Sequence, residues 1–282
     1  MLEGGFFLRL WRITLYIVVT LTIAPIQAVL LAVKAPLSRR FPSIYHRLCL
    51  GIMGFRVDVV GEPSTSHPTL YVANHASYLD IPVLGSIIHG SFVAKAEIAG
   101  WPFFGMLAKL QRSVFVDRRP GTTKTQRDAL MSRLEEGDDL IIFPEATSSD
   151  SIHMIPFKSA LLSVAEFRPH GAPLAVQPVT VAYVRLDGMP IGRFYRPFVA
   201  WYGAMQVAPH LWTVIGLGKI TVRVIFHPPV TLEQFGSRKE LTVHCYKVIA
   251  AGLAAALAGR GPGSESDIED EPEELMAEAD AE

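Results

Sequence analysis

Short apolar runs alternate with amphipathic stretches from about residue 55 onward, which predicts strands and helices in turn. Strands are expected where the runs are short and rich in β-branched or aromatic residues: 55–61, 69–74, 91–96, 113–118, 139–147 (running into a turn at Pro144), 174–184 and 219–230. Helices are expected over 81–88, 123–137, 159–167 and 238–259. This alternation is typical of an α/β fold with a mixed, largely covered sheet flanked by helices.

The first 54 residues have a different pattern. Residues 13–33 form an uncharged run of 21 residues, which is about the length that crosses a bilayer as a helix. Pro25 and Gln27 fall inside this run and would kink or weaken a spanning helix. Residues 36–54 mix basic and apolar positions in the manner of an interfacial helix. We therefore expect an N-terminal membrane helix or helical hairpin, with a buried soluble helix as the alternative.

Composition supports contact with a membrane. Apolar residues make up 50% of the 282 residues, and the mean hydropathy of +0.29 is high for a fully soluble protein. The net charge of −1 hides an asymmetry, because residues 261–282 hold ten acidic residues and no basic ones, which leaves 26 basic and 17 acidic residues elsewhere. A basic body favours an anionic lipid surface. Nucleic acid is not expected, since no basic stripe is interleaved with aromatic residues.

These patterns divide the chain into three parts. Residues 1–54 are a membrane-anchoring helical segment, residues 55–260 an α/β domain large enough for an enzyme, and residues 261–282 an acidic tail. The tail is expected to be disordered, because it has too few apolar residues to offset chain entropy. Cys49 and Cys245 lie far apart and are expected to be reduced thiols. The histidines are scattered, so neither a metal site nor a bound cofactor is expected.

Polar residues follow several of the predicted strands. The stretch "NHASYLD" places His75 in a turn and Asp80 in the helix that follows. The Asp80 carboxylate could then reach one imidazole nitrogen, fix the tautomer and leave the other nitrogen as a general base. Chance also produces this spacing, so an alternative stays open in which Asn74 or Ser77 caps the helix and His75 is only a hydrogen-bonded junction residue.

Polar residues at two other strand ends favour an active or binding site over this capping alternative. "SVFVDR" ends with Arg118, and "FPEATSS" brings Glu145 together with a run of hydroxyl residues. An arginine and a short hydroxyl-rich turn are what binding of a phosphate or carboxylate head group requires.

Taken in order, four segments resemble the blocks of the glycerolipid (lysophospholipid) acyltransferase family over roughly residues 70–185: "NHASYLD", "SVFVDR", "FPEATSS" and "VQPVTV". The resemblance implies that His75 is the base and Asp80 its partner. It also implies that a lysolipid acceptor is bound by Arg118, Glu145, Ala146 and Thr147. The acyl donor would be acyl-CoA or acyl carrier protein. The location would be the bacterial inner membrane, with the active domain on its cytoplasmic side.

The third block departs from the family's usual Phe-Pro-Glu-Gly-Thr-Arg-Ser, because this chain has Ala146, Thr147 and Ser148. The missing arginine is the residue expected to bind an acceptor's phosphate, and residues 201–222 resemble the bacterial branch that includes acylation of lyso-ornithine lipid. The first expectation is conversion of 1-acylglycerol-3-phosphate to phosphatidic acid, with lyso-ornithine lipid as the alternative acceptor. A catalytically silent membrane lipid-binding protein is the non-enzyme alternative. No G-x-S-x-G elbow indicates a serine hydrolase, and no P-loop indicates a nucleotide-dependent enzyme.

Overall fold

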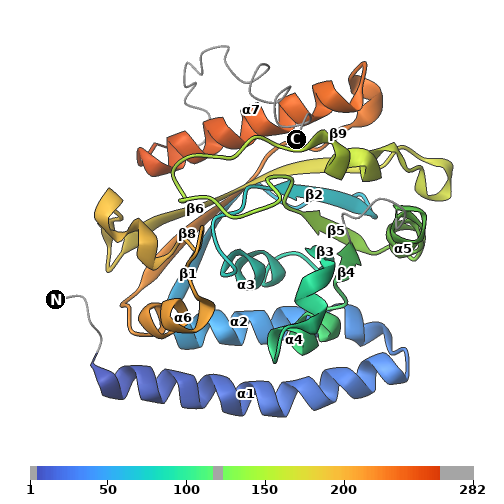
Figure 1. Ribbon diagram of the computed structural model, residues 1–282. Coiled ribbons are helices and arrows are strands. Elements are labelled where there is room, and N and C mark those ends of the chain that lie inside the picture. The colour runs from blue at the N-terminus through green and yellow to red at the C-terminus, as the bar shows by residue number, and fades with distance from the viewer. Residues whose placement is uncertain (1–4, 117–122, 261–282) are drawn as a thin grey trace.

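A mixed sheet lies between two groups of helices in the computed structural model, which describes residues 5–116 and 123–260 (Figure 1). The strands follow the order β1-β8-β6-β2-β5-β3-β4, and the short β7 and β9 both pair with β6. Their bounds are β1 Phe55–Val60, β2 Thr69–Ala73, β3 Gly90–Lys95, β4 Val114–Val116, β5 Asp139–Ile142, β6 Ala175–Leu186, β7 Met189–Pro190, β8 Ile220–Phe226 and β9 Val230–Thr231. The predicted site residue Arg118 and the acidic tail, residues 261–282, lie outside the described residues.

The helices cover both faces of this sheet. Helix α7 lies on one face, and α3 lies on the other with α2 and then α1 beyond it (Figure 1). Their bounds are α1 Phe6–Ala32, α2 Phe41–Met53, α3 Asp80–Gly85, α4 Phe104–Leu110, α5 Thr123–Glu135, α6 Val207–Ile215 and α7 Arg238–Leu257. The predicted mixed, covered α/β sheet is confirmed. The helix expected over 159–167 is a 3-10 helix, η3 (Ser159–Glu166), and α4 and α6 were not predicted.

Strand β2 shows why this part of the chain forms a fully buried strand. Successive side chains of a strand point to opposite faces. Leu70 and Val72 accordingly join the core beneath α7, while Tyr71 and Ala73 join the core that contains residues of α2 and α3. β2 pairs in parallel with β5 on one side and with β6 on the other. The carboxyl ends of these strands therefore meet at one edge of the sheet.

The N-terminal segment forms a hairpin of two helices. Helix α1 continues through Pro25, and α2 returns alongside it after a short 3-10 helix, η1 (Pro36–Arg39) (Figure 1). Both α1 and α7 are long and apolar enough to cross a membrane. In the most apolar part of α7, 44% of the residues are buried, whereas in that of α1 only 11% are buried. Helix α1 thus presents most of its apolar surface outward.

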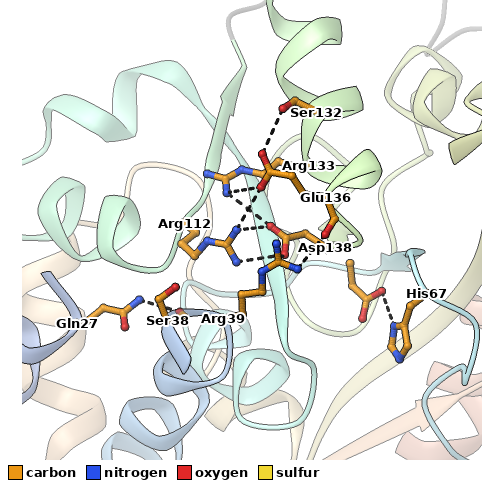
Figure 2. Close-up of polar contacts among 10 residues, drawn as sticks. Gln27, Ser38, Arg39, His67, Arg112, Ser132, Arg133, Glu136 and Asp138 are labelled. Carbon is orange, nitrogen blue, oxygen red and sulfur yellow. Dashed lines mark hydrogen bonds and ion pairs between the residues drawn. The ribbon is translucent and has the colours of Figure 1, made fainter. Parts of the chain in front are cut away.

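An ion-pair cluster fastens the hairpin to the amino end of β5. Asp138 is 4% exposed and directly precedes β5. Figure 2 shows three arginines around its carboxylate: Arg112, which binds both oxygens, Arg39 at 3.3 Å and Arg133 at 3.5 Å. The cluster therefore joins η1, the α4–β4 connection and α5 at the end of β5 that lies away from residue 145.

Candidate active site

Asn74 fixes the start of the turn that carries His75. Its side-chain Nδ2 donates to the Val181 carbonyl at 2.9 Å, and its Oδ1 accepts from the Val181 N–H at 2.8 Å. Asn74, the residue that follows β2, thus pairs with β6 through its side chain, whereas β2 itself pairs with β6 through its backbone. Helix α3 has no side-chain cap, and the buried Ser77 hydroxyl has no partner among the described residues. The alternative in which Asn74 or Ser77 caps the helix is therefore wrong.

His75 and Asp80 are in direct contact. The His75 Nδ1 lies 2.8 Å from the Asp80 Oδ2, and the same oxygen accepts the N–H groups of Ala76 at 2.8 Å and Ser77 at 2.9 Å. A carboxylate only accepts hydrogen bonds, so this contact needs a proton on Nδ1, and in the neutral imidazole Nε2 then carries the lone pair. The Asp80 side chain is completely buried, whereas that of His75 is 20% exposed. The second ring nitrogen, which has no hydrogen-bond partner among the described residues, thus belongs to the more accessible residue of the pair.

Tyr183 completes the surroundings of Asp80. Tyr183 lies in the carboxyl-terminal half of β6, and its hydroxyl donates to the Asp80 Oδ1 at 2.7 Å. Burial, followed by the charge of Asp80, raises the pKa of Tyr183 well above its usual value, so the hydroxyl remains a donor. Asp80 therefore receives four hydrogen bonds, which hold its carboxylate in one orientation. The sequence does not indicate this role of Tyr183, because a tyrosine within an apolar strand carries no signal of such a contact.

The His75 ring lies on an aromatic stack beside an apolar cavity. It stacks on Phe143 with centroids 4.2 Å apart, and Phe143 stacks in turn on Phe92 at 6.2 Å. The cavity of about 290 Å³ is lined by His75, Phe92 and Tyr78, and its walls extend over residues of α1, α2, α4 and α6. Phe143, at the carboxyl end of β5, thereby sets the plane of the imidazole beside a space suited to an aliphatic chain.

Glu145 stabilises the turn that carries His75 through hydrogen bonds to the backbone. Its side chain is 1% exposed, and its two oxygens accept the N–H groups of His75 at 2.9 Å and Ile155 at 3.2 Å. Burial raises the pKa of Glu145 to about 8, against the two N–H groups, which lower it. The His75 carbonyl accepts the Ser149 N–H at 2.8 Å. The third block thus holds both backbone polar groups of His75, and the expected contact of Glu145 with an acceptor stays a prediction.

The other residues of the third block occupy different positions. Ala146 adopts a left-handed conformation with φ of 64°, which costs energy for a residue other than glycine. Thr147 is exposed at the surface of the turn. Ser148, where the resembled family has arginine, is buried and donates its hydroxyl to the Trp201 carbonyl. The backbone N–H of Trp201 in turn donates to the Ala76 carbonyl at 2.8 Å, which places Trp201 beside the turn that carries His75.

Together these contacts define a class of protein. An oriented imidazole whose second nitrogen has no partner among the described residues, beside an apolar cavity and at the ends of parallel strands, has the parts needed to deprotonate a hydroxyl attached to a lipid. Such an arrangement suits a transferase or hydrolase that acts on an acyl lipid.

Comparison with known proteins narrows this class. The acyltransferase family model matches residues 56–182. A lyso-ornithine lipid O-acyltransferase from Brucella abortus is 41% identical over 248 residues, which cover 86% of this chain and 93% of that protein. A second one, from Rhizobium meliloti, is 36% identical over 250 residues, covering 87% and 86%. A 1-acyl-sn-glycerol-3-phosphate acyltransferase from Neisseria meningitidis is 33% identical over 175 residues, covering 59% and 63%.

The fold has a counterpart among solved structures. The crystal structure of a 1-acyl-sn-glycerophosphate acyltransferase from Thermotoga maritima matches with a TM-score of 0.59 over 89% of this chain and 99% of that one, at 20% identity. The chain belongs to the lysophospholipid acyltransferase family and is an acyltransferase of lipid metabolism.

Proposed function

We propose that this protein transfers an acyl group from a thioester donor, acyl-CoA or acyl carrier protein, to the hydroxyl of lyso-ornithine lipid, with His75 as the general base. The observation that carries this proposal is the contact between His75 Nδ1 and the fully buried Asp80, at 2.8 Å, on the wall of an apolar cavity. It supports a base whose second nitrogen is available to the acceptor hydroxyl.

We infer the following reaction, which this geometry supports. His75 Nε2 takes the proton of the acceptor hydroxyl while its oxygen attacks the thioester carbonyl carbon. The new C–O bond forms, the C–S bond breaks, and the imidazolium returns its proton to the leaving sulfur. Asp80 stabilises the imidazolium between these two transfers. Because four donors hold the Asp80 carboxylate, it need not reorient when the charge on His75 appears.

Two observations favour lyso-ornithine lipid over 1-acylglycerol-3-phosphate as the acceptor. The relatives that match nearly the whole chain at 36–41% identity carry the former name, whereas the Neisseria relative matches over 59% of the chain. Ser148 replaces the arginine expected for a phosphate and is turned toward the Trp201 carbonyl. These observations favour lyso-ornithine lipid, which the sequence alone suggested only as the alternative acceptor.

We also propose that α1 holds the protein against a membrane. Its outward side carries large apolar side chains, among them Phe7 at 83% exposure, Trp11 at 64% and Leu21 at 69%. Such a surface is what an amphipathic helix buries in the head-group region of a bilayer.

The acyl-transfer proposal is tested with the full chain purified in detergent. Labelled acyl-CoA and acyl carrier protein are each offered with lyso-ornithine lipid, 1-acylglycerol-3-phosphate and other lysolipids. We expect acylation of lyso-ornithine lipid by the wild type and a loss of about 10²- to 10⁴-fold in kcat for His75→Ala.

His67→Ala is the matched control. His67 also pairs with a buried carboxylate, that of Asp139 at 3.0 Å, but at the opposite end of β5. Equal, background-level transfer by the wild type and His75→Ala to every acceptor would leave only the lipid-binding alternative. Transfer confined to 1-acylglycerol-3-phosphate would refute lyso-ornithine lipid as the acceptor.

A further inference from the structure

Strand β1 is the longer of the two edge strands of the sheet. It stands at the end of the strand order and, among the described strands, pairs only with β8. This pairing runs without a bulge from Phe55 to Val60. The opposite edge is β4, which has only three residues. An open edge strand offers a row of backbone groups with which another strand can pair, and β1 is long enough to do so.

Every second residue of β1 directs its backbone groups away from β8. In a parallel ladder, a residue bonds to the two neighbours of the residue that it faces. Ile220 faces Phe55, and its N–H donates to the Gly54 carbonyl at 3.1 Å. The residues that direct their N–H and C=O groups outward are therefore Phe55, Val57 and Val59. In the described part of the chain, no strand pairs with this side of β1.

The side chains of β1 place two opposite charges on one face of the sheet. Val60 packs with residues of α7, so Arg56 and Asp58, at alternate positions of the same strand, also lie on the α7 face. The Arg56 Nε donates to the Asp58 Oδ1 at 2.9 Å, and the two side chains are 63% and 32% exposed. Val57 lies between them in the sequence and packs on the opposite face. The two charges are therefore placed symmetrically about Val57.

A second copy of β1 in antiparallel orientation complements this pattern. With a two-fold axis at Val57, the two Val57 residues face each other and Phe55 faces Val59 of the second copy, so all the outward backbone groups are paired. Arg56 then lies opposite Asp58 of the second copy, in the type of pair whose side chains come closest. Moving the axis by one residue, to Arg56 or to Asp58, would set like charges opposite each other. The sequence of β1 thus favours one register.

We propose that two copies of this chain form a dimer through antiparallel pairing of β1 about Val57. The dimer joins the two sheets into one continuous sheet. No residue of β1 lines the cavity beside His75, so this interface is separate from the site of acyl transfer. The inference therefore goes beyond the proposed function and does not depend on it.

The position of α1 is compatible with this dimer. The axis that relates two paired antiparallel strands is perpendicular to their sheet. Helices α7 and α1 lie on opposite sides of the sheet, with α1 outermost (Figure 1). Rotation about this axis leaves both copies of α1 on the same side. The outward apolar side chains of the two copies, among them Trp11 and Leu21, thus face one and the same bilayer.

Charge reversal on β1 tests the pairing. The mass of the full chain, purified in detergent, is measured by size-exclusion chromatography with multi-angle light scattering. We expect the wild type to have the protein mass of two chains. Arg56→Asp and Asp58→Arg each set like charges opposite each other on both sides of the axis. Each should raise the dissociation constant of the dimer by about tenfold or more.

Mixing the two variants restores opposite charges across the axis. An Arg56→Asp chain carries two acidic residues at these positions, and an Asp58→Arg chain carries two basic ones. The mixture should therefore form heterodimers with a dissociation constant close to that of the wild type, which co-purification of differently tagged chains detects. Pairing in the mixture also shows that each variant is folded.

Glu233→Arg is the matched control, because Glu233 pairs with Arg168 at an exposed site outside β1. It should leave the mass unchanged. The inference is overturned if the wild type is a monomer, if both single variants keep the dissociation constant of the wild type, or if the mixed variants do not pair. Acyl transfer is measured separately, so none of these outcomes refutes the proposed function.

Discussion

Glu145 is a titratable residue whose ionisation affects the turn that carries His75. It is buried and accepts the backbone N–H groups of His75 and Ile155, and burial raises its pKa to about 8. In the unfolded chain the same carboxyl ionises near its ordinary value of 4.5. Between these two values folding takes up a proton, so the contribution of Glu145 to stability is complete below pH 4.5 and is lost as the pH rises toward 8.

Glu145→Gln should remove this pH dependence. We expect the unfolding free energy of the wild type, relative to the variant, to fall by up to about 1.4 kcal/mol per pH unit within the window. Unfolding in detergent, followed at several values between pH 5 and pH 8, measures it. Glu166→Gln, at a carboxylate that is 42% exposed beside Arg238, is the control. A difference that stays constant with pH would contradict the prediction.

At the same scale, the sequence indicated the parts of the site that are close together along the chain. The five-residue spacing of His75 and Asp80 places them on one turn, and their contact follows from local geometry. Tyr183 and Val181 reach this turn from β6, more than 100 residues later. That approach depends on strand order, which no local pattern specifies. The role of Glu145 as a backbone acceptor likewise needs the β2–β5 pairing to be known.

Among the elements, β2, β5 and β6 were predicted because they are buried on both faces over most of their length and are therefore rich in apolar residues. Helices α4 and α6 were missed. Both are short, at seven and nine residues, and both pack along the cavity with apolar side chains on more than one side. A segment of about two turns is too short for a helical period to be recognised.

Helix α1 gives a prediction at this scale. Ile17 and Leu21 lie one turn apart on its outward side, 47% and 69% exposed. Replacing both with glutamate should weaken binding to anionic lipid vesicles by about tenfold or more per substitution, because each apolar side chain loses its burial in the bilayer. Vesicle co-sedimentation measures it. Met189→Glu on β7, at a site 70% exposed, is the control. Unchanged binding by the double variant would contradict the proposed contact with the membrane.

In the whole molecule, the ion-pair cluster around Asp138 and the residues around His75 lie at opposite ends of β5. Phe143 and Glu145 follow its carboxyl end, while Asp138, with its three arginines, precedes its amino end (Figure 2). A buried carboxylate among cations leaves those charges uncompensated when it is neutralised. The cluster should therefore affect unfolding and not the acyl-transfer step.

Asp138→Asn should lower the unfolding free energy by about 3 kcal/mol. The kcat/KM of the folded enzyme should stay close to that of the wild type, since, among the residues that the structure describes, the cluster has no hydrogen bond or ion pair to the turn that carries His75. Thermal unfolding and acyl transfer below the transition measure the two effects. Glu136→Gln, at a carboxylate 49% exposed, should cost less than about 1 kcal/mol. A parallel fall in kcat/KM would show that the two ends are coupled.

The position of α1 has a consequence for any soluble version of this enzyme. The same helix that carries the outward apolar side chains also supplies one wall of the cavity beside His75, through residues such as Tyr16 and Ile23. We therefore predict that deleting α1 would open this cavity to water. In the proposed reaction, water would then compete with the lipid hydroxyl for the thioester, and the shortened protein would hydrolyse its donor. The helix proposed to contact the membrane is also the one that closes the cavity.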